Sequence, residues 1–152
     1  MEEEFHNHMR IPWHDYTRKS IGRPITEASL SEKASIIGRT GIMLLSCGTG
    51  AWRVRSSMNT LARELGITCT ADIGLLSIEY TCIDGGNCYT ESLCLFNTGV
   101  NTSKLYRMEL FVNKFSKNCK KMSGDELHTL LDQIHEIHGF YSPAFLDRKS
   151  VV

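Results

Sequence analysis

The hydrophobic period changes in the middle of the chain, and this change constrains the fold more than any other sequence feature. From Thr68 to Asn97 the sequence is rich in Ile, Leu, Thr, Tyr, Cys and Phe, and Ile78, Tyr80 and Cys82 alternate with polar residues. Such alternation is typical of a half-buried strand. The run Asp84-Gly85-Gly86-Asn87 has the composition of a tight turn. The pattern therefore predicts a hairpin whose second strand covers 89–96, preceded by a shorter strand over 69–73.

Helical signals lie on both sides of this segment. Ser29 with Glu32, and Ser123 with Glu126, have the spacing of a capping box, in which each side chain satisfies a free backbone N–H. Gly66 follows an apolar stripe of helical spacing and indicates a left-handed helix end. We predict helices over about 30–46, 51–65, 105–115 and 124–139, the third capped by Asn101, Thr102 or Ser103.

The element order is then α-α-β-β-β-α-α. This order predicts an α+β fold of two layers, with a small antiparallel sheet packed on helices. Gly38 and Gly41 lower the helix propensity of the first helix, so we expect another helix to approach it closely there. The expected organisation is a loosely ordered leader over 1–27, a domain over 28–140 and a tail over 141–152.

Composition limits the kinds of partner. The 17 basic and 17 acidic residues give a formal net charge of zero, which argues against a nucleic-acid partner. Little electrostatic repulsion then opposes a homo-oligomer. The most apolar stretch, Ile36 to Cys47, contains Arg39 and is shorter than the ~20 residues that a membrane span needs.

The six cysteines admit two interpretations. They could form a disulfide framework, but Met1 is followed by three glutamates rather than by the basic and apolar regions of a signal peptide. We therefore favour reduced thiols that behave as small buried hydrophobes in the cytoplasm.

The stretch from Gly41 to Gly66 reads GIMLLSCGTGAWRVRSSMNTLARELG. It resembles the opening of the N-terminal soluble domain of the threonine/serine exporter family. The likeness continues in order through Ala71-Asp72, the hairpin, Gly99-x-Asn101 and a helix that contains Asn113, and it covers roughly residues 30–138. One departure is Arg55, which stands after Arg-Val where family members often have an acidic residue.

The resemblance implies a bacterial membrane exporter of threonine and serine, or of dicarboxylates such as succinate. This chain would be its non-enzymatic cytoplasmic domain, with a regulatory or assembly role, at the cytoplasmic face of the cell membrane. The expected partner is the membrane-spanning half, in the same or a separate chain, and residues 141–152 would lead to an expected membrane segment. No cofactor is implied.

Three residues are candidates for binding a small amino acid or dicarboxylate. Arg53 lies in the matched motif and begins a helix, where a cation opposes the helix dipole. We expect it to pair with a carboxylate: either that of Asp72, which is the favoured reading, or that of a substrate. Asn101, in the matched Gly-x-Asn motif, is the third candidate.

Other polar residues could support chemistry, although we predict no catalytic residue and no metal site. Asp132 between His128 and His135 could hold a metal, but the two histidines are about 10 Å apart along a helix and fit the border of an amphipathic face better. The leader histidines His6, His8 and His14 could bind metal only adventitiously.

The alternative function is a small hydrolase-like enzyme that acts on a polar metabolite. Cys47 would be the nucleophile, with Asp72 and either His128 or His135 in support, although a packed helix end is the favoured interpretation of Cys47. The turn Ser46–Gly50 could bind an anion, but it lacks the Lys-Ser/Thr ending of a P-loop. A freestanding ligand-binding domain is a third possibility.

Overall fold

The computed structural model describes residues 11–137 of the chain. Their elements, in chain order, are the helices α1 (Trp13–Tyr16), η2 (Arg18–Ser20), η3 (Ile25–Glu27), α2 (Leu30–Ser46) and α3 (Ala51–Glu64), the strands β1 (Thr68–Ile73), β2 (Ser77–Asp84) and β3 (Asn87–Cys94), and the helices α4 (Thr102–Asn113), α5 (Phe115–Asn118) and α6 (Gly124–His135).

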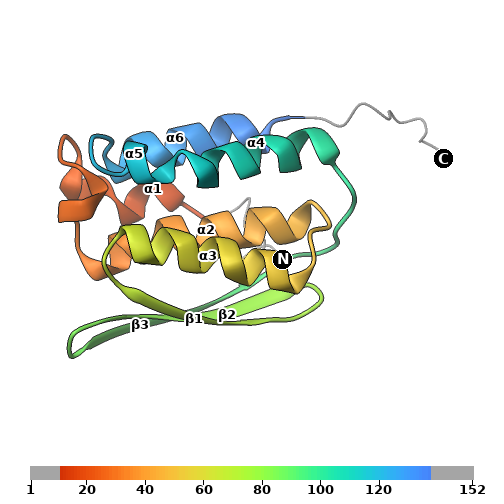
Figure 1. Cartoon of the computed structure of the whole chain (residues 1–152), viewed down its shortest axis with the longest axis horizontal. Helices are drawn as coiled ribbons and strands as arrows, with labels where there is room; N and C mark the ends of the chain where they lie inside the picture. Colours follow the sequence, from red (N-terminus) through yellow and green to blue (C-terminus); the bar gives the residue numbers. More distant parts are fainter. Residues whose placement is uncertain (1–10, 138–152) are drawn as a thin grey trace.

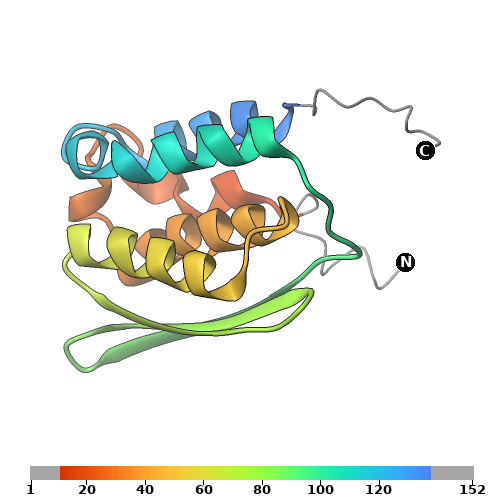
Figure 2. The same ribbon diagram turned by 45° about the vertical axis from the view of Figure 1, so that its right-hand side comes forward.

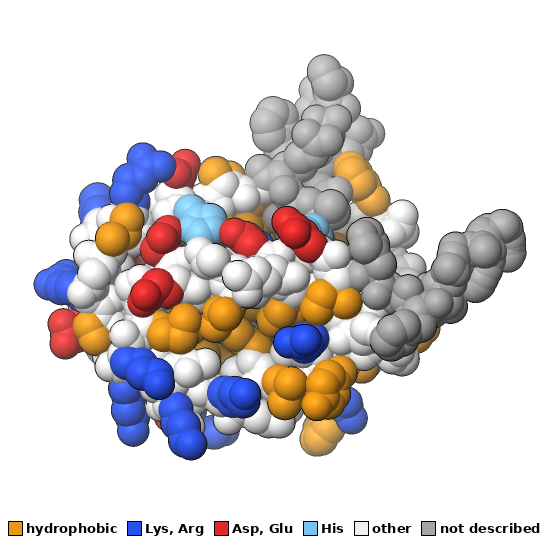
Figure 3. Space-filling view, turned by 90° about the horizontal axis from the view of Figure 1, so that it is seen from above, with side chains coloured by type: hydrophobic (Ala, Val, Ile, Leu, Met, Phe, Trp, Pro, Cys, Tyr) orange, Lys and Arg blue, Asp and Glu red, His pale blue; other side chains and the backbone are white. Residues whose placement is uncertain are grey.

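The elements are stacked in three tiers (Figure 1). The sheet forms one outer tier, α2 and α3 lie on it, and α4, α5 and α6 cover the opposite side of α2 and α3 (Figure 2). The outward face of this helical tier is shown in Figure 3. The predicted α+β class with a small antiparallel sheet is confirmed. The helices form two tiers rather than one, since α2 is apolar on more than one side and must be covered on each.

Helix α2 lies at the centre of the molecule. The predicted capping box is present, and the backbone N–H of Ser29 donates to Glu32 Oε1 over 2.9 Å. From Glu32 to Leu45 every residue is buried. A helix buried on all sides places any polar residue in it inside the protein, which decides where the candidate site lies.

Two glycines in α2 allow close packing, against different kinds of neighbour. A Cβ at Gly41 would lie 2.5 Å from Met58 Sδ of α3, so the predicted helix approach is confirmed there. A Cβ at Gly38 would overlap the phenol of Tyr80 from β2, so at this position the close neighbour is the sheet. A glycine in a helix indicates that a neighbour packs closely there, but the sequence does not indicate which element supplies that neighbour.

The sheet has the order β1-β2-β3, and both strand pairs are antiparallel. Asp84 pairs with Asn87 at the predicted turn, and Gly85 adopts a φ of 62° that favours glycine. The inward residues of β2 are Ile78, Tyr80 and Cys82, as the alternation predicts.

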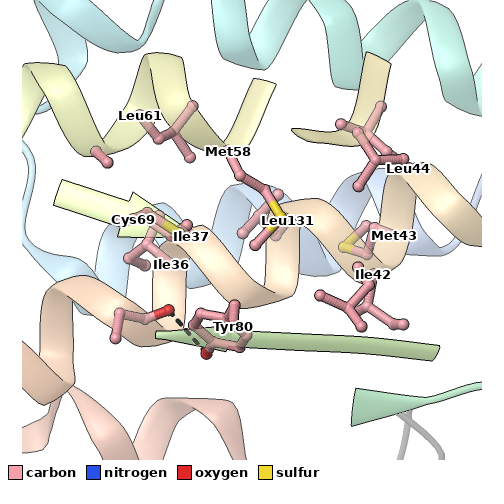
Figure 4. Close-up of a cluster of buried hydrophobic side chains, with 14 of the residues drawn as sticks. Ile36, Ile37, Ile42, Met43, Leu44, Met58, Leu61, Cys69, Tyr80 and Leu131 are labelled. Carbon is pink, nitrogen blue, oxygen red and sulfur yellow. Dashed lines mark hydrogen bonds between the residues drawn. The ribbon is translucent and has the colours of Figure 1, made fainter. Parts of the chain in front are cut away.

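The core fills the space between the sheet and α6. Figure 4 shows Tyr80 pointing from the sheet toward α2, with Met58 and Leu61 of α3 and Leu131 of α6 nearby; all four are at most 1% exposed. The Tyr80 hydroxyl lies 3.1 Å from the Ala34 carbonyl oxygen and 3.0 Å from Glu91 Oε1. The core therefore includes a polar group, and its hydroxyl has acceptors within hydrogen-bonding distance.

Residues 11–27, which the sequence analysis assigns to a loosely ordered leader, contain three short helices. Trp13 and Ile25 are buried, with 4% and 0% exposure. Sequence periodicity misses this segment because elements of three or four residues have no repeat from which to read a period.

Three further expectations concern the cysteines, the last helix and membrane spans. All six cysteines are free thiols; Cys88 is exposed, whereas four others are buried. Helix α6 ends at His135, and the predicted end at Gly139 lies outside the described residues. Within 11–137 no helix has the length and apolar character that a bilayer crossing requires.

Candidate functional site

Arg39 is the one arginine in the buried stretch of α2, and the candidate site is built around it. It is 5% exposed, and burial lowers the pKa of the guanidinium, although the Asp132 carboxylate opposes this effect. A buried charge is stable only when it is paired and hydrogen-bonded. Its hydrogen-bond partners come from α6, which lies across from α2 in the outer tier.

His128 is the first partner. Arg39 Nη1 donates to His128 Nδ1 and to the His128 carbonyl oxygen, each over 3.1 Å. Since Nδ1 accepts, the ring is neutral and its Nε2 donates to Ser35 Oγ, 3.0 Å away. Ser35 Oγ then donates to the Glu32 carbonyl oxygen over 2.7 Å. Complete burial, with the Arg39 charge adding to it, lowers the pKa of His128 to about 3.

Asp132 is the second partner, and it joins two cations. Its Oδ1 accepts from Arg39 Nη2 over 2.5 Å, and its Oδ2 lies 2.7 Å from His14 Nε2. Burial alone would raise the pKa of the carboxyl group. The hydrogen bonds from His14 and Arg39 outweigh burial and lower this pKa below its ordinary value, so Asp132 is charged at neutral pH.

His14 connects α1 to α6. Its Nδ1 lies 2.6 Å from Asp125 Oδ1, so each ring nitrogen faces a carboxylate. Burial opposes protonation of the ring, but the hydrogen bonds with Asp132 and Asp125 prevail and raise the pKa of His14 above 6.5. Only the imidazolium can donate to both carboxylates at once, so the bridge is complete in the protonated form.

Trp13 covers the inner part of this cluster. Its ring stacks on His128 at 5.9 Å between centroids, and the guanidinium carbon of Arg39 lies 5.8 Å from the indole centroid. A cation over an indole face is electrostatically favoured. We call the set Trp13, His14, Ser35, Arg39, Asp125, His128 and Asp132 the polar cluster.

A pocket of about 240 Å³ opens beside the polar cluster. Its polar wall comprises Arg39, His14, Asp15, Asp132 and His135, and Ile11, Pro12 and Trp13 form its apolar wall. The Nε of Arg39 is buried and has no hydrogen-bond partner among residues 11–137. An unsatisfied donor is unusual in a protein interior.

The three ligand residues predicted from sequence each have different neighbours. Arg53 forms an ion pair with Glu109 of α4, so the favoured pairing with Asp72 is wrong. The prediction considered only the short sequence distance between Arg53 and Asp72. That distance gives no indication that the partner comes from α4, which lies far along the chain. Asp72 is exposed on β1 opposite Glu79.

Asn101 is the N-cap of α4. Its Oδ1 accepts from the backbone N–H of Lys104 over 3.0 Å, and its Nδ2 donates to the Ile137 carbonyl oxygen over 3.2 Å. The cap prediction is confirmed. Within the described residues no hydrogen bond or ion pair joins any two of Arg53, Asp72 and Asn101, and a shared ligand site for them stays a prediction.

Three of the residues proposed for hydrolysis, Cys47, Asp72 and His128, do not assemble. Cys47 follows Ser35 on α2 by twelve positions and Arg39 by eight, or roughly 18 and 12 Å along a helix, and His128 bonds to those two residues. Burial raises the pKa of the Cys47 thiol, which disfavours the nucleophilic thiolate. Asp72 lies in the sheet, and α2 and α3 separate it from α6 (Figure 1).

The alternative hypothesis of a metal site at Asp132 and its flanking histidines on α6 is not supported either. Both ring nitrogens of His128 and both oxygens of Asp132 already have partners in the polar cluster. Over residues 11–137 no group of three or more His, Cys, Asp or Glu is arranged to hold a metal ion. His14, expected to be an incidental leader residue, is a bridge between carboxylates, and His6, His8 and His138 lie outside the described residues.

Sequence reasoning missed Arg39 as a site residue. The signal was available, because a lone arginine in an otherwise apolar helix requires a buried partner. Asp132, on the border of the last amphipathic helix, was the matching carboxylate. No comparable signal identifies His14, since its role depends on the path of the segment that precedes α2.

The stacked α+β body with an internal polar cluster is compatible with several protein classes, and sequence comparison decides among them. The sequence model of the family described as "Putative threonine/serine exporter" matches residues 35–146. The chain belongs to this threonine/serine exporter family, as the ordered motifs from Gly41 to Asn113 indicate. No significant similarity links the chain to a curated protein or to a solved structure.

Proposed function

We propose that this chain supplies the cytoplasmic, non-catalytic domain of a membrane exporter of small polar metabolites, of threonine/serine or dicarboxylate type. Its role is to regulate or assemble the exporter. The observation that carries the proposal is the family match over residues 35–146, which runs from within α2 through α6 and so extends over all three tiers. The bacterial setting and the position at the cytoplasmic face of the cell membrane belong to the same proposal.

The absence of catalysis is supported by how the ionisable groups are used. Arg39, His128, Asp132 and His14 bind one another, and the thiol of Cys47 is kept protonated by burial. A catalytic base needs to reach a substrate proton, whereas His128 is fully buried with both nitrogens occupied. These groups therefore form a network that joins α1, α2 and α6 and that changes its charge with pH.

The metabolite would meet the domain at the pocket beside Arg39. A cavity of about 240 Å³ is smaller than the ~300–1,000 Å³ of drug-sized sites and suits a small amino acid or a dicarboxylate. The ligand carboxylate would pair with the guanidinium of Arg39, which lines the pocket and has one donor, Nε, without a partner in 11–137. Through Arg39 the ligand would influence α2 and α6 together.

The membrane-spanning half of the exporter, in the same or a separate chain, is the expected partner. The test is efflux of labelled threonine, serine and succinate from cells that lack their own exporters. The assembly with this chain should export at least one compound, and removal of residues 11–137 should abolish or misregulate that export. Unchanged efflux of every compound that the assembly exports would overturn the proposal.

A second measurement tests the pocket alone. A carboxylate ligand should raise the Tm of the purified chain by mass action. Threonine amide, which lacks the carboxylate, is the matched control and should leave the Tm unchanged. Equal increases in Tm with threonine and with its amide would show that Arg39 does not recognise the carboxylate of the ligand.

A further inference from the structure

A second feature of the molecule lies on its outer helical tier, away from the polar cluster. A groove of about 490 Å³ runs between α4 and α6. It is lined by the apolar side chains of Leu110, Phe111, Leu130, Ile134 and Ile137, and by Arg107, Lys114, Asn118 and Gln133. Figure 3 shows this apolar band on the outward face. An apolar band bordered by polar side chains is a surface that a partner can cover.

The two sides of the groove carry opposite charge. Lys and Arg side chains lie on one side of the apolar band, and Asp and Glu side chains lie on the other (Figure 3). The basic row comprises Arg107 and Lys114, which line the groove, and the acidic row comprises the exposed Glu126 and Glu136. The face is therefore ordered as basic row, apolar groove, acidic row.

This order makes the face complementary to itself. A two-fold axis along the groove places α4 of one copy against α6 of the other, so that each basic row meets an acidic row. Asn101 at the start of α4 bonds to Ile137 at the end of α6, so the two helices run antiparallel (Figure 1). Arg107 would then face the C-terminal half of α6 of the second copy, which leads to Glu136, and Lys114 would face its N-terminal half, which carries Glu126. An axis across the groove would instead place like charges together, which opposes association.

We propose that the α4–α6 groove is the docking site for a second copy of this chain, in a two-fold symmetric dimer. An isologous interface requires a surface complementary to itself, and this face meets that requirement with both signs of charge. An anionic membrane surface would attract the basic row but would be repelled by the acidic row. The inference does not depend on the exporter proposal.

The charge rows provide a direct test by sedimentation equilibrium of the full chain at low ionic strength. Wild type should associate to a dimer between micromolar and millimolar concentration. Arg107→Glu places two carboxylates opposite each other twice per dimer, so the dimer dissociation constant should rise by about tenfold or more. Glu136→Arg should weaken the dimer similarly.

The double variant R107E/E136R exchanges the two signs and should restore most of the association. Arg63→Glu, an exposed α3 position with the same change in charge, is the matched control and should dimerise like wild type. Circular dichroism of each variant should match wild type, because both Arg107 and Glu136 are exposed.

Three results would overturn the proposal. The first is a wild-type chain that stays monomeric up to millimolar concentration, as it would if the groove received residues 138–152 or the membrane-spanning half. The second is a dimer that is unaffected by R107E and E136R. The third is a double variant no better associated than the two single variants, because the proposed axis requires the pairing to be restored.

Discussion

The two sides of α2 are held by different forces. Toward the sheet and α3 it packs through Gly38, Gly41 and apolar side chains against Tyr80 and Met58. Toward α1 and α6 it presents Ser35 and Arg39 to a set of titratable groups. Burial of apolar area depends little on pH, whereas paired ionisable groups link stability to protonation. One helix thus joins a pH-independent region to a pH-dependent one.

The apolar region should show the largest loss on truncation. Leu61→Ala removes a fully buried side chain of α3 and should lower the free energy of unfolding by about 3 kcal/mol. Urea titrations at several pH values near neutrality should give the same loss each time. Leu75→Ala, at a position 86% exposed, is the control and should change stability little. A strongly pH-dependent loss for Leu61→Ala would show that the two sides of α2 do not differ in the pH dependence of their contribution to stability.

Arg39→Met should produce the next largest loss. The substitution leaves His128 Nδ1 and Asp132 Oδ1 without their donor, and removing one partner of a buried pair costs several kcal/mol. Because Asp132 is 44% exposed and water can replace part of the interaction, we expect about 2 kcal/mol. The matched control is Arg63→Met at an exposed site. A variant as stable as wild type would show that the cluster contributes nothing net.

His128 should determine how the stability of the protein decreases at acid pH, which we call the acid limb. Its folded pKa of about 3 lies below its ordinary value of 6.5, so the unfolded chain binds a proton first as the pH falls below 6.5. Stability should therefore decrease by about 1 kcal/mol between pH 6 and pH 5. His128→Gln should flatten this limb. The depressed pKa of Asp132 adds to the loss at lower pH, and an equal slope in H128Q would assign the acid limb to that group.

His14 should have the smallest effect, with the opposite sign. Its folded pKa is raised above 6.5, so its contribution is fully present below that pH and is lost as the pH rises through the folded value. The side chain is 40% exposed, so we expect His14→Gln to cost about 0.5 kcal/mol at pH 6 and less at pH 9. The protection of the Trp13–Tyr16 amides, measured relative to intrinsic exchange at each pH, should decrease over the same pH interval in wild type but not in His14→Gln.

The same contrast explains which features could be predicted from sequence. Capping boxes at Ser29 and Ser123 and the turn at Gly85 are local signals, and the structure has each in place. The α+β order follows from them. The polar cluster joins His14, Arg39 and Asp132 across more than 90 positions, and no local period encodes such a contact. The Arg53 pairing failed for this reason, since Glu109 lies 56 positions away.

The measurement that tests the account most directly compares export with stability. We propose that the polar side of α2 serves the exporter, whereas its apolar side only holds the fold. Efflux from the complete assembly should therefore fall further in Arg39→Met than in Leu61→Ala, at a temperature where both variants are folded, although Leu61→Ala is the less stable. Export that instead follows stability, with Leu61→Ala the weaker exporter, would contradict the account.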